Sequence, residues 1–381
     1  MKVKLFLTGI LSPKGRHWWL GIFLWVVMVN PAQAGVILRV AIERGVNQVK
    51  VGSSTTAIIK DGTGHNLGQL PAQSAYYAQP APGGVALDKW RSPMFWIEPS
   101  GKGFVYIGDH WYRGKTLVVP TDKGLTAVNY VDLEEYLYSV VGAEVFSSWP
   151  IEALKAQAVT ARTFAVYKRE TAQKGVYDVG ATPDSWQAYR GVETEASSIY
   201  QAVDQTAGQV LVYNNQPILS VFHNCSGGHT ENVEDIWGEN NKPYLRGVDG
   251  YDQNEDAKEC KWAKTFSGDD LSRRVSGVGN VKNITQELTQ YRSTKSLTII
   301  GDQGTKVLRG DELRNKLGLK SQRFQISQPT PGVFQFDGLG WGHGLGMSQW
   351  GSRNLAEKKA TYLQILAHYY QGVSLAKLQV K

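Results

Sequence analysis

The chain of 381 residues lacks an internal repeat, a long run of charges of one sign and a second long apolar stretch. Beyond residues 18–29, no apolar run approaches the roughly 20 residues that a membrane-spanning helix needs. The 41 glycines follow no three-residue period, which excludes collagen, and an apolar share of 42% excludes a disordered chain. The length is sufficient for one large or two ordinary domains.

Acidic residues are absent from the first 34 positions, which hold four of the 41 basic residues. In the remaining sequence, 37 basic residues stand against 34 acidic ones, so more than half of the formal net charge of +7 belongs to the N-terminus. The small excess that is left is a weak argument for nucleic acid, and we expect no nucleic-acid partner. It is compatible with an anionic polymer such as a cell wall.

The N-terminus has the three parts of a secretion signal. Residues 1–17 contain the cations, residues 18–29 are almost wholly apolar, and Pro31, Ala32 and Ala34 supply the small residues of a cleavage site. We therefore predict a signal peptide over residues 1–34, cleaved after Ala34, and export to the periplasm or cell wall. The alternative, favoured by the long basic region, is an uncleaved anchor, and the protein would then meet the membrane only through this segment.

The sequence contains two cysteines, Cys225 and Cys260. Both lie in the part predicted to be exported, where a disulfide can persist. A disulfide between them and two free thiols both remain open at this point.

Period-two alternation predicts a β-rich N-terminal region over residues 35–115. Val36, Leu38, Val40 and Ile42 alternate with other residues, and short strand-like runs follow. Residues 69–84, rich in Ala, Pro and Gln, are interpreted as a surface loop. With the helices described next, the fold class is α+β: a β-rich region followed by a mixed core, with a helical pair and a glycine-rich strand segment lining a cleft.

Two helices are predicted after residue 131. Asp132 stands three residues before Glu135, as in a capping box, and starts a helix that ends near Gly142. The second helix begins at Ser148, with Pro150 tolerated in its first turn. Its inner stripe, spaced by three and four residues, consists of Ile151, Leu154, Ala158, Ala161 and Ala165.

Glu144 lies in the predicted link between these helices, where a carboxyl group is held more firmly than on a long loop. Glycosidic cleavage needs an acid that protonates the leaving oxygen. Such an acid works at neutral pH only if burial raises its pKa. The alternative is a solvated carboxylate.

A second candidate site is F-H-N-C-S-G-G-H-T-E, which starts at Phe222. Two imidazoles and a thiol suggest zinc, but the spacing of His223, Cys225 and His229 matches no usual zinc motif. A nucleophilic Cys225–His pair is another option, against which a possible disulfide partner argues. The third interpretation is a strand that enters a glycine turn, with imidazoles that form hydrogen bonds or line a cleft. We predict neither a metal nor a cofactor.

The segment 338–351, G-L-G-W-G-H-G-L-G-M-S-Q-W-G, has glycine at nearly every second position. Glycine lets the backbone approach a ligand or another strand closely. The spacing does not fit a dinucleotide fingerprint, and no P-loop lysine is present, which argues against phosphate binding. His343 has little local bulk around it, which favours an exposed functional imidazole, although a structural histidine in a bulged strand is the alternative. Ser348 is also suited to cap the helix that follows.

Three segments together resemble the SpoIID/LytB family. They are Y-L-Y-S-V-V-G-A-E-V-F-S-S-W-P-I-E-A-L-K-A-Q-A-V-T-A-R-T-F-A-V-Y at 136–167, F-H-N-C-S-G-G-H-T-E-N at 222–232 and G-W-G-H-G-L-G-M-S-Q-W-G at 340–351. I-L-A-H-Y-Y-Q-G at 365–372 also fits. The resemblance covers about two thirds of the chain and implies a catalytic domain over residues 116–372.

The resemblance implies lytic transglycosylase action on the glycan strands of peptidoglycan. Sporulation members of the family act on glycan stripped of its stem peptides, and other members are described as amidase enhancers, so a cell-wall amidase is a possible partner. The catalytic glutamate of the family falls on Glu144, and its conserved arginine falls on Arg162. The residues that we expect to bind substrate are Arg162, Lys155, Gln157, His223, Ser226, His229, His343, Ser348 and Gln349.

The implied chemistry needs one carboxyl group. Glu144 protonates the oxygen between N-acetylmuramic acid and N-acetylglucosamine, and the muramic 6-hydroxyl, deprotonated by the same group, closes a 1,6-anhydro ring. A second carboxylate is unnecessary because the nucleophile belongs to the substrate. Arg162 either pairs with a lactyl carboxylate or orients Glu144.

The sequence departs from the family pattern at three places. Phe146 stands where a proline is frequent, and Lys359 replaces a glycine between the last two helices. Gly180 and Trp186 occupy the positions of a cysteine pair that binds zinc in some members, so this zinc site is not carried over.

Two rival functions remain. One is a non-catalytic glycan-binding protein that stimulates an amidase. The other is a zinc- or thiol-dependent hydrolase that uses His223, Cys225 and His229.

Overall fold

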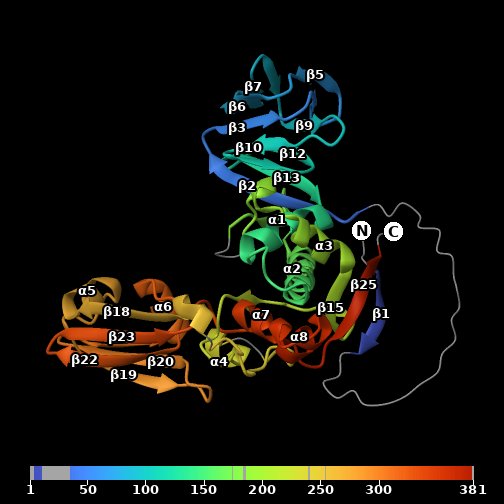
Figure 1. The fold of residues 1–381 in the computed structure, drawn as a ribbon. Coiled ribbons are helices and arrows are strands. Elements are labelled where there is room, and N and C mark those ends of the chain that lie inside the picture. Colours follow the sequence, from blue (N-terminus) through green and yellow to red (C-terminus); the bar gives the residue numbers. More distant parts are fainter. Residues whose placement is uncertain are drawn as a thin grey trace, which may run out of the picture. The chain divides into compact units, whose positions relative to one another are not determined.

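The computed structural model describes residues 35–173, 175–182, 186–238, 241–253 and 255–379, together with strand β1 (Lys4–Ile10). The predicted cleavage site after Ala34, and most of the predicted signal peptide, lie outside the described residues. In the described part, no helix has both the length and the apolar character needed to cross a membrane. The α+β class and the β-rich N-terminal region are confirmed (Figure 1).

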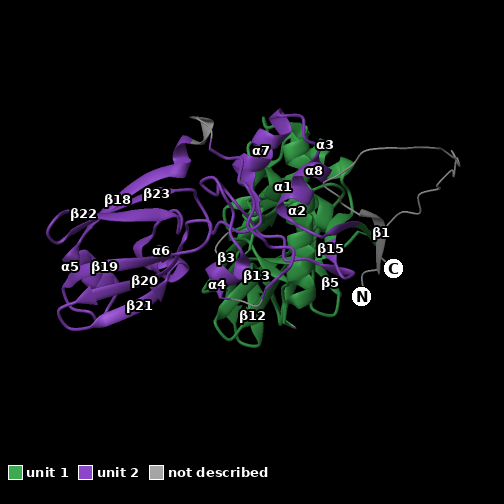
Figure 2. Cartoon of the chain, turned by 90° about the horizontal axis from the view of Figure 1, so that it is seen from below, with its two compact units in different colours: residues 1–8, 17–211, 376–381 green, residues 9–16, 212–375 purple. Residues whose placement is uncertain are grey.

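The chain forms two compact units (Figure 2). Unit 1 comprises Met1–Thr8, His17–Leu211 and Ala376–Lys381, and unit 2 comprises Gly9–Arg16 and Val212–Leu375. The chain passes from unit 1 to unit 2 within β15 (Gln209–Tyr213) and returns within β25 (Ser374–Gln379). The strand β25, which follows the predicted last helix, was not expected from the sequence.

Two sheets form the β-rich part of unit 1. The six-stranded sheet has the order β11-β10-β3-β6-β7-β8, with bounds His110–Tyr112, Val105–Ile107, Val49–Ser53, Ser74–Ala81, Gly84–Leu87 and Trp90–Ser92. The seven-stranded sheet has the order β14-β2-β13-β12-β9-β4-β5, with bounds Val179–Gly180, Ile37–Val46, Gly124–Asp132, Lys115–Thr121, Phe95–Pro99, Ala57–Lys60 and Asn66–Leu70. Because β2 and β9 share a sheet with β12 and β13, the predicted boundary at residue 115 does not coincide with a boundary between units.

The interpretation of residues 69–84 as a surface loop is wrong. Within this range lie the end of β5, the whole of β6 and the first residue of β7. Strand β6 pairs with β3 on one side and β7 on the other, so backbone hydrogen bonds sustain it although Ala78 is its single fully buried side chain. The composition of this segment concealed it, because a strand between two partners needs few apolar residues.

The helical pair of unit 1 is α1 (Leu133–Glu144) and α2 (Ile151–Thr171), with η1 (Gly191–Thr194) and α3 (Ser197–Gln205) beside it. Asp132 caps α1 as predicted, and its carboxylate accepts from the Glu134 N–H at 2.9 Å. The helix continues two residues beyond the expected end at Gly142, so Glu144 is its last residue and not part of a link. Pro150 is the N-cap of α2, which therefore begins later than Ser148.

Unit 2 brings its two motif segments together through a short parallel pair, β17 (Phe222–His223) and β24 (Met347–Ser348). Asn214 and Asn215, between two strand-like runs of the sequence, predict a hairpin turn. The structure has this hairpin as β15 and β16 (Gln216–Pro217), with both asparagines at positive φ. The strands β1, β25, β15 and β16 follow one another in one sheet. The remaining elements are α4 (Val233–Trp237), η2 (Glu255–Cys260), α7 (Gln349–Glu357) and α8 (Tyr362–Tyr369).

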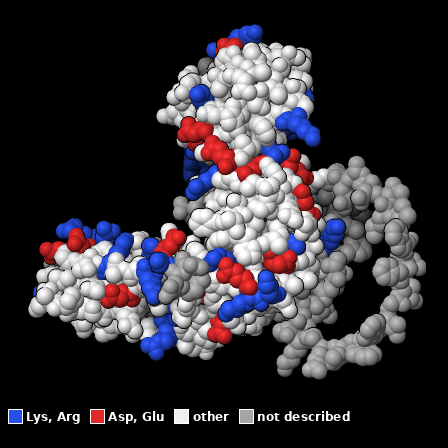
Figure 3. Space-filling model, viewed as in Figure 1, with Lys and Arg blue, Asp and Glu red and all other residues white. Residues whose placement is uncertain are grey.

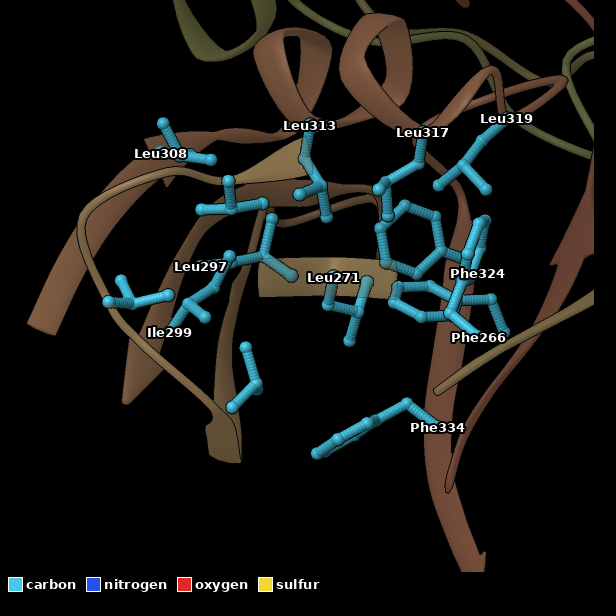
Figure 4. Close-up of a cluster of buried hydrophobic side chains, with 14 residues drawn as sticks. Phe266, Leu271, Leu297, Ile299, Leu308, Leu313, Leu317, Leu319, Phe324 and Phe334 are labelled. Atoms are coloured by element: carbon cyan, nitrogen blue, oxygen red, sulfur yellow. The ribbon is translucent and has the colours of Figure 1, made fainter. Parts of the chain in front are cut away.

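Residues 261–339 form a subdomain of unit 2 with its own core, which we call the 261–339 subdomain. One sheet has the order β18-β23-β22, with bounds Lys261–Ser267, Val333–Leu339 and Phe324–Thr330, and the other has the order β19-β20-β21, with bounds Val281–Leu288, Thr294–Gly301 and Thr305–Arg309. The subdomain also contains the helices α5 (Gly268–Arg274) and α6 (Gly310–Leu317). Leucines from both helices meet phenylalanines of the first sheet in the core (Figure 4).

The guanidinium of Arg162 on α2 is completely buried and holds four elements of unit 1 together. It forms an ion pair with Glu134 in the first turn of α1, at 2.6 Å. It also donates to the Val203 carbonyl of α3 and to the Gln209 carbonyl of β15, both at 3.2 Å. All three guanidinium nitrogens are therefore engaged within the protein.

The structure pairs Cys225 with Cys260. Cys225 follows β17 by two residues, and Cys260 directly precedes β18, so the bond attaches the start of the 261–339 subdomain to the histidine motif. Backbone contacts support the same junction, because the Gly340 N–H donates to the Cys260 carbonyl and Cys225 bridges to Trp341. With both thiols oxidised, Cys225 has no thiolate to act as a nucleophile or metal ligand.

Replacing Arg162 with alanine should lower the free energy of unfolding by about 3 kcal/mol, because it leaves the partly buried Glu134 carboxylate without its cation and removes one donor from each of two carbonyls. Lys155→Ala is a matched control on the same helix. Its ion pair with Glu152 lies nearer the surface, and its loss should cost about 1 kcal/mol or less. Urea unfolding of both variants checks this. Equal effects would contradict the structural role of Arg162.

Removing the disulfide should lower the free energy of unfolding by about 4 kcal/mol, the loop-closure entropy expected for a separation of 35 residues. The double variant Cys225→Ser/Cys260→Ser, compared with wild type in oxidising buffer, tests this. Titration of the unfolded wild-type protein with a thiol reagent supplies a second readout. Two reactive thiols would show that the bond is absent.

Candidate active site

Glu144 is half-buried at the C-terminal end of α1. Its Oε1 atom accepts a hydrogen bond of 2.9 Å from the backbone N–H of Ala188. Phe146, which stands at the frequent proline position of the family, is 61% exposed. The carboxyl group is thus placed by the helix and oriented by a segment more than 40 residues further along the chain.

Residues 186–190, here called the 186–190 segment, are fixed directly after Ala188 by two hydrogen bonds and a ring cluster. The Tyr189 hydroxyl donates to Asn129 Oδ1 at 2.7 Å, and the Arg190 N–H donates to Ser139 Oγ on α1 at 3.1 Å. The Tyr189 ring is buried against the rings of Tyr112 and Tyr136, with centroids 5.0 and 4.7 Å away. These contacts leave the Ala188 N–H little freedom to move away from Glu144.

Tyr136 and Gln187 form a second link between α1 and the 186–190 segment. The Tyr136 hydroxyl donates to Gln187 Oε1 at 3.3 Å. Burial and the charge of Glu144 raise the pKa of Tyr136, so its hydroxyl remains a neutral donor. In the described part of the chain, the buried Nε2 atom of Gln187 has no hydrogen-bond partner.

The three predicted binding residues of α2, Lys155, Gln157 and Arg162, differ in their contacts within the protein. Lys155 forms an ion pair with Glu152 at 2.8 Å. Gln157 is fully buried, and both atoms of its amide lack a partner among the described residues. The geometry does not support a contact between Arg162 and substrate, nor an orienting bond to Glu144, because its nitrogens are occupied by Glu134 and backbone carbonyls.

The positions that hold zinc-binding cysteines in some family members are packed together differently here. The ring of Trp186 lies directly on Gly180, where a Cβ atom would come within 2.6 Å of the indole. The Arg44 guanidinium covers the same ring at 4.9 Å. This aromatic contact anchors the start of the 186–190 segment.

In unit 2, the carboxylate of Asp252 joins two of the predicted binding residues. Asp252 is buried and accepts from the hydroxyls of Ser226 at 2.8 Å and Ser348 at 2.7 Å, and from the Gly228 N–H at 2.8 Å. Ser348 Oγ in turn accepts from the Gly351 N–H at 3.1 Å and so caps α7, the alternative considered from the sequence. Both serines therefore hold the fold of the motif together.

His223 is buried as a neutral ring with a defined tautomer. Its Nδ1 atom lies 3.0 Å from the Leu345 carbonyl, which can only accept, so Nδ1 carries the hydrogen. Nε2 is then an unprotonated nitrogen, and it has no hydrogen-bond partner in the described part of the chain. Burial lowers the pKa of His223 to about 4, so the ring is neutral at physiological pH.

His343 has the opposite tautomer. Its Nδ1 atom accepts from the Leu345 N–H at 3.1 Å, so the hydrogen of the neutral ring is on Nε2. The ring lies between those of His223 and Trp237, with both centroids 5.4 Å away, and burial lowers its pKa well below the ordinary value. The imidazole is half-buried and not fully exposed as expected, because residues distant in sequence supply the bulk that its glycine neighbours lack.

The glycines around His343 are required by both conformation and space. Gly342 has a φ of 117°, and a Cβ atom there would lie 2.6 Å from His223 Cβ. Gly346 has a φ of 66°, and its Cβ atom would lie 2.1 Å from the Val221 carbonyl oxygen. Side chains at either position would separate the two motif segments.

The last two predicted residues of unit 2 are also held by neighbours. The His229 ring stacks on Tyr291 at 3.9 Å, and its Nδ1 atom lies 2.6 Å from the Thr230 carbonyl. Gln349 is buried at the start of α7. The structure thus assembles His223, Ser226, His343 and Ser348 around one junction, whereas His229 lies against the 261–339 subdomain.

Three residues of these sites were missed from the sequence: Gln187, Ala188 and Asp252. Ala188 acts through its backbone, which no side-chain pattern reveals. Asp252 lies in a polar, turn-rich stretch without periodicity, where a structural carboxylate looks like any solvated one.

The stability of unit 2 should depend on the protonation of His223. The unfolded ring takes up a proton below about pH 6.5, while the folded ring stays neutral until about pH 4, so stability is lost as the pH falls through this window. The free energy of unfolding should fall by about 2 kcal/mol between pH 7 and pH 5. Urea titrations at both pH values measure it.

In His223→Gln this decrease should become smaller, whereas replacing His65, an exposed histidine of unit 1, should leave it unchanged. A pH dependence that persists in His223→Gln would show that other groups cause it.

Comparisons with known proteins agree with the motifs. Residues 121–213 match the family model of the stage II sporulation protein, SpoIID. An uncharacterized protein of Brachyspira hyodysenteriae is 34% identical over 280 residues, which cover 72% of this chain and 74% of that protein. The stage II sporulation protein D of Bacillus subtilis is 32% identical over 269 residues, covering 66% and 76% of the two chains.

A further relative is the amidase enhancer of Bacillus subtilis, which is 28% identical over 299 residues that cover 63% of this chain and 40% of that protein. The resemblance inferred from three separate motifs is therefore confirmed over most of the chain, and the protein belongs to the SpoIID/LytB family.

Proposed function

We propose that this protein is an exported lytic transglycosylase that cleaves the bond between N-acetylmuramic acid and N-acetylglucosamine in peptidoglycan. The observation that carries this proposal is the placement of Glu144, half-buried at the end of α1 with one oxygen oriented by a backbone N–H. The relatives named for sporulation and for amidase enhancement support the coarser statement that the protein has a role in the cell wall.

The helix favours the acid form of Glu144. The C-terminal end of a helix carries partial negative charge, so a carboxylate there is disfavoured relative to the neutral acid. The last turn of α1 contains no basic residue. The Ala188 N–H acts in the opposite direction, because a donor to the carboxylate favours its charged form. Protonation of a glycosidic oxygen, the first step, requires the acid form.

In the proposed reaction, Glu144 gives its proton to the leaving oxygen as the bond to the muramic anomeric carbon breaks. The positive charge that develops there is quenched by the 6-hydroxyl of the same sugar. The resulting carboxylate of Glu144 removes the hydroxyl proton, so the acid is regenerated and the product is a 1,6-anhydro sugar. Water is not consumed, and one carboxyl group performs both proton transfers.

A second candidate function is a glycan-binding protein that stimulates a cell-wall amidase without cleaving glycan itself. The named amidase enhancer among the relatives favours it. The two functions make different demands on Glu144, because binding alone does not need a proton donor. The third possibility, a thiol-dependent hydrolase, loses its nucleophile to the disulfide.

Purified glycan strands freed of peptides, digested with wild type and with Glu144→Gln, separate the two candidates. We expect 1,6-anhydro products from wild type and a decrease of at least 100-fold in Glu144→Gln, the contribution typical of a general acid. Glu135→Gln is the matched control, since Glu135 is on the same helix with a partly exposed carboxylate near Arg113. Mass spectrometry of the released sugars gives the readout.

Binding of glycan by both proteins with no anhydro product from either would contradict the transglycosylase and favour the enhancer. Equal losses in Glu135→Gln and Glu144→Gln would show that charge on α1, and not the position of the acid, matters. Analysis of the mature N-terminus in culture fractions tests the proposed export and cleavage after Ala34.

A further inference from the structure

A pocket of about 760 Å³ is lined mainly by the 261–339 subdomain, with Gly227 of the histidine motif and Gln253 at its edge, and Glu144 does not line it. Its volume lies within the range of small-molecule sites, roughly 300–1,000 Å³. The floor is the sheet β18-β23-β22, in which Ala263, Asp337 and Gln325 are paired across the three strands. These residues alternate with Phe336 of the core, so they lie on the outer face of the sheet.

Basic side chains predominate around this pocket. Lys261, Arg292 and Arg323 line it, against one acidic residue, Asp337. Glu231 neutralises Arg323 in an ion pair of 3.1 Å. Within the part of the chain that the structure describes, Lys261 and Arg292 have no acidic partner. On the face seen in Figure 3, lysine and arginine side chains gather over the same subdomain.

Arg292 is held in a conformation that suits glycine. It lies in the turn between β19 and β20 with a φ of 73°, where a residue with a side chain is strained. The turn is closed by hydrogen bonds between Thr289 and Ser293, which keep the guanidinium at the pocket. A strained residue that presents an unpaired cation to a pocket is the arrangement expected of a ligand-binding residue.

The remaining lining suits a sugar. Gln253 and Gln325 offer amide groups for hydroxyls, and Leu339, which is 40% exposed, supplies an apolar surface. Apolar surface beside amide donors is the usual environment of a pyranose or polyol.

We propose that this pocket binds a polyol or sugar unit that carries one anionic group, and so anchors the protein to an anionic cell-wall polymer independently of Glu144. The choice of a cell-wall polymer rests on the proposed function. Two sources share the required chemistry: the free carboxylate of a muramic acid unit and the phosphate of a polyol-phosphate chain. Lys261 and Arg292 would bind the anion, and the amides would bind hydroxyls.

Calorimetric titration of the full chain tests the proposal, with Glu144→Gln as the background so that no ligand is cleaved. The probes are a disaccharide with a free muramic carboxylate, a glycerol-phosphate oligomer, and a neutral N-acetylglucosamine disaccharide. An anionic probe should bind at least tenfold more tightly than the neutral one, and the difference should shrink at high salt. The tighter of the two anionic probes identifies the source.

Arg292→Gly is the decisive variant, because glycine suits the backbone at this position and the fold is preserved. It should weaken binding of the anionic probe about tenfold, as should Lys261→Met. Lys282→Met is the control, since Lys282 is exposed on β19 and does not line the pocket. Unchanged affinity in Arg292→Gly and Lys261→Met, an equal loss in Lys282→Met, or equal binding of neutral and anionic probes overturns the proposal.

The two proposals fail separately. If Glu144→Gln still forms anhydro sugars, the proposed catalytic function is contradicted while binding at the pocket remains measurable. If wild type cleaves soluble glycan and the pocket variants bind the anionic probes normally, the pocket proposal is contradicted and the function stands.

Discussion

The hydrogen bond from the Ala188 N–H to Glu144 is the constraint on which the candidate acid depends. A backbone donor cannot rotate away as a side chain can, so the carboxyl position follows the path of the 186–190 segment. That path is set by Tyr189, which bonds Asn129 of β13, while Asn129 donates in turn to the Arg113 carbonyl. The β-rich region thus contributes to the orientation of the acid, through the loop before β12 and the ring of Tyr112.

In unit 2, the backbone of a single residue, Leu345, orients two side chains in a comparable way. The carbonyl of Leu345 accepts from His223, and its N–H donates to His343, so a single residue fixes opposite tautomers in two neighbouring rings. This requires the chain to fold back twice within a few residues, which the left-handed glycines on either side permit. Any substitution that shifts this backbone changes both imidazoles together, although neither histidine is altered.

The sequence predicted local features well where a local rule governs them. Asp132 at the start of α1, the alanine stripe of α2 and the asparagine turn of the β15–β16 hairpin follow from capping, periodicity and turn chemistry within a few residues. Features that depend on contacts between distant residues could not be predicted. The sequence does not show that Arg162 pairs with Glu134, so it resembled a ligand-binding arginine. Nor does it show that the rings of Trp237 and His223 pack against His343, so this imidazole was expected to be exposed.

Buried polar atoms that lack a hydrogen-bond partner lower the stability of the fold. Each costs about 1–3 kcal/mol, and such atoms are rare in folded proteins. In the described residues they include both amide atoms of Gln157 and the Nε2 atom of Gln187 in unit 1, and the Nε2 atom of His223 in unit 2. Gln157 and His223 belong to segments that carry the family resemblance, and Gln187 adjoins the donor to Glu144. An apolar side chain at these positions would avoid this cost, so stability alone does not account for the polar groups found there.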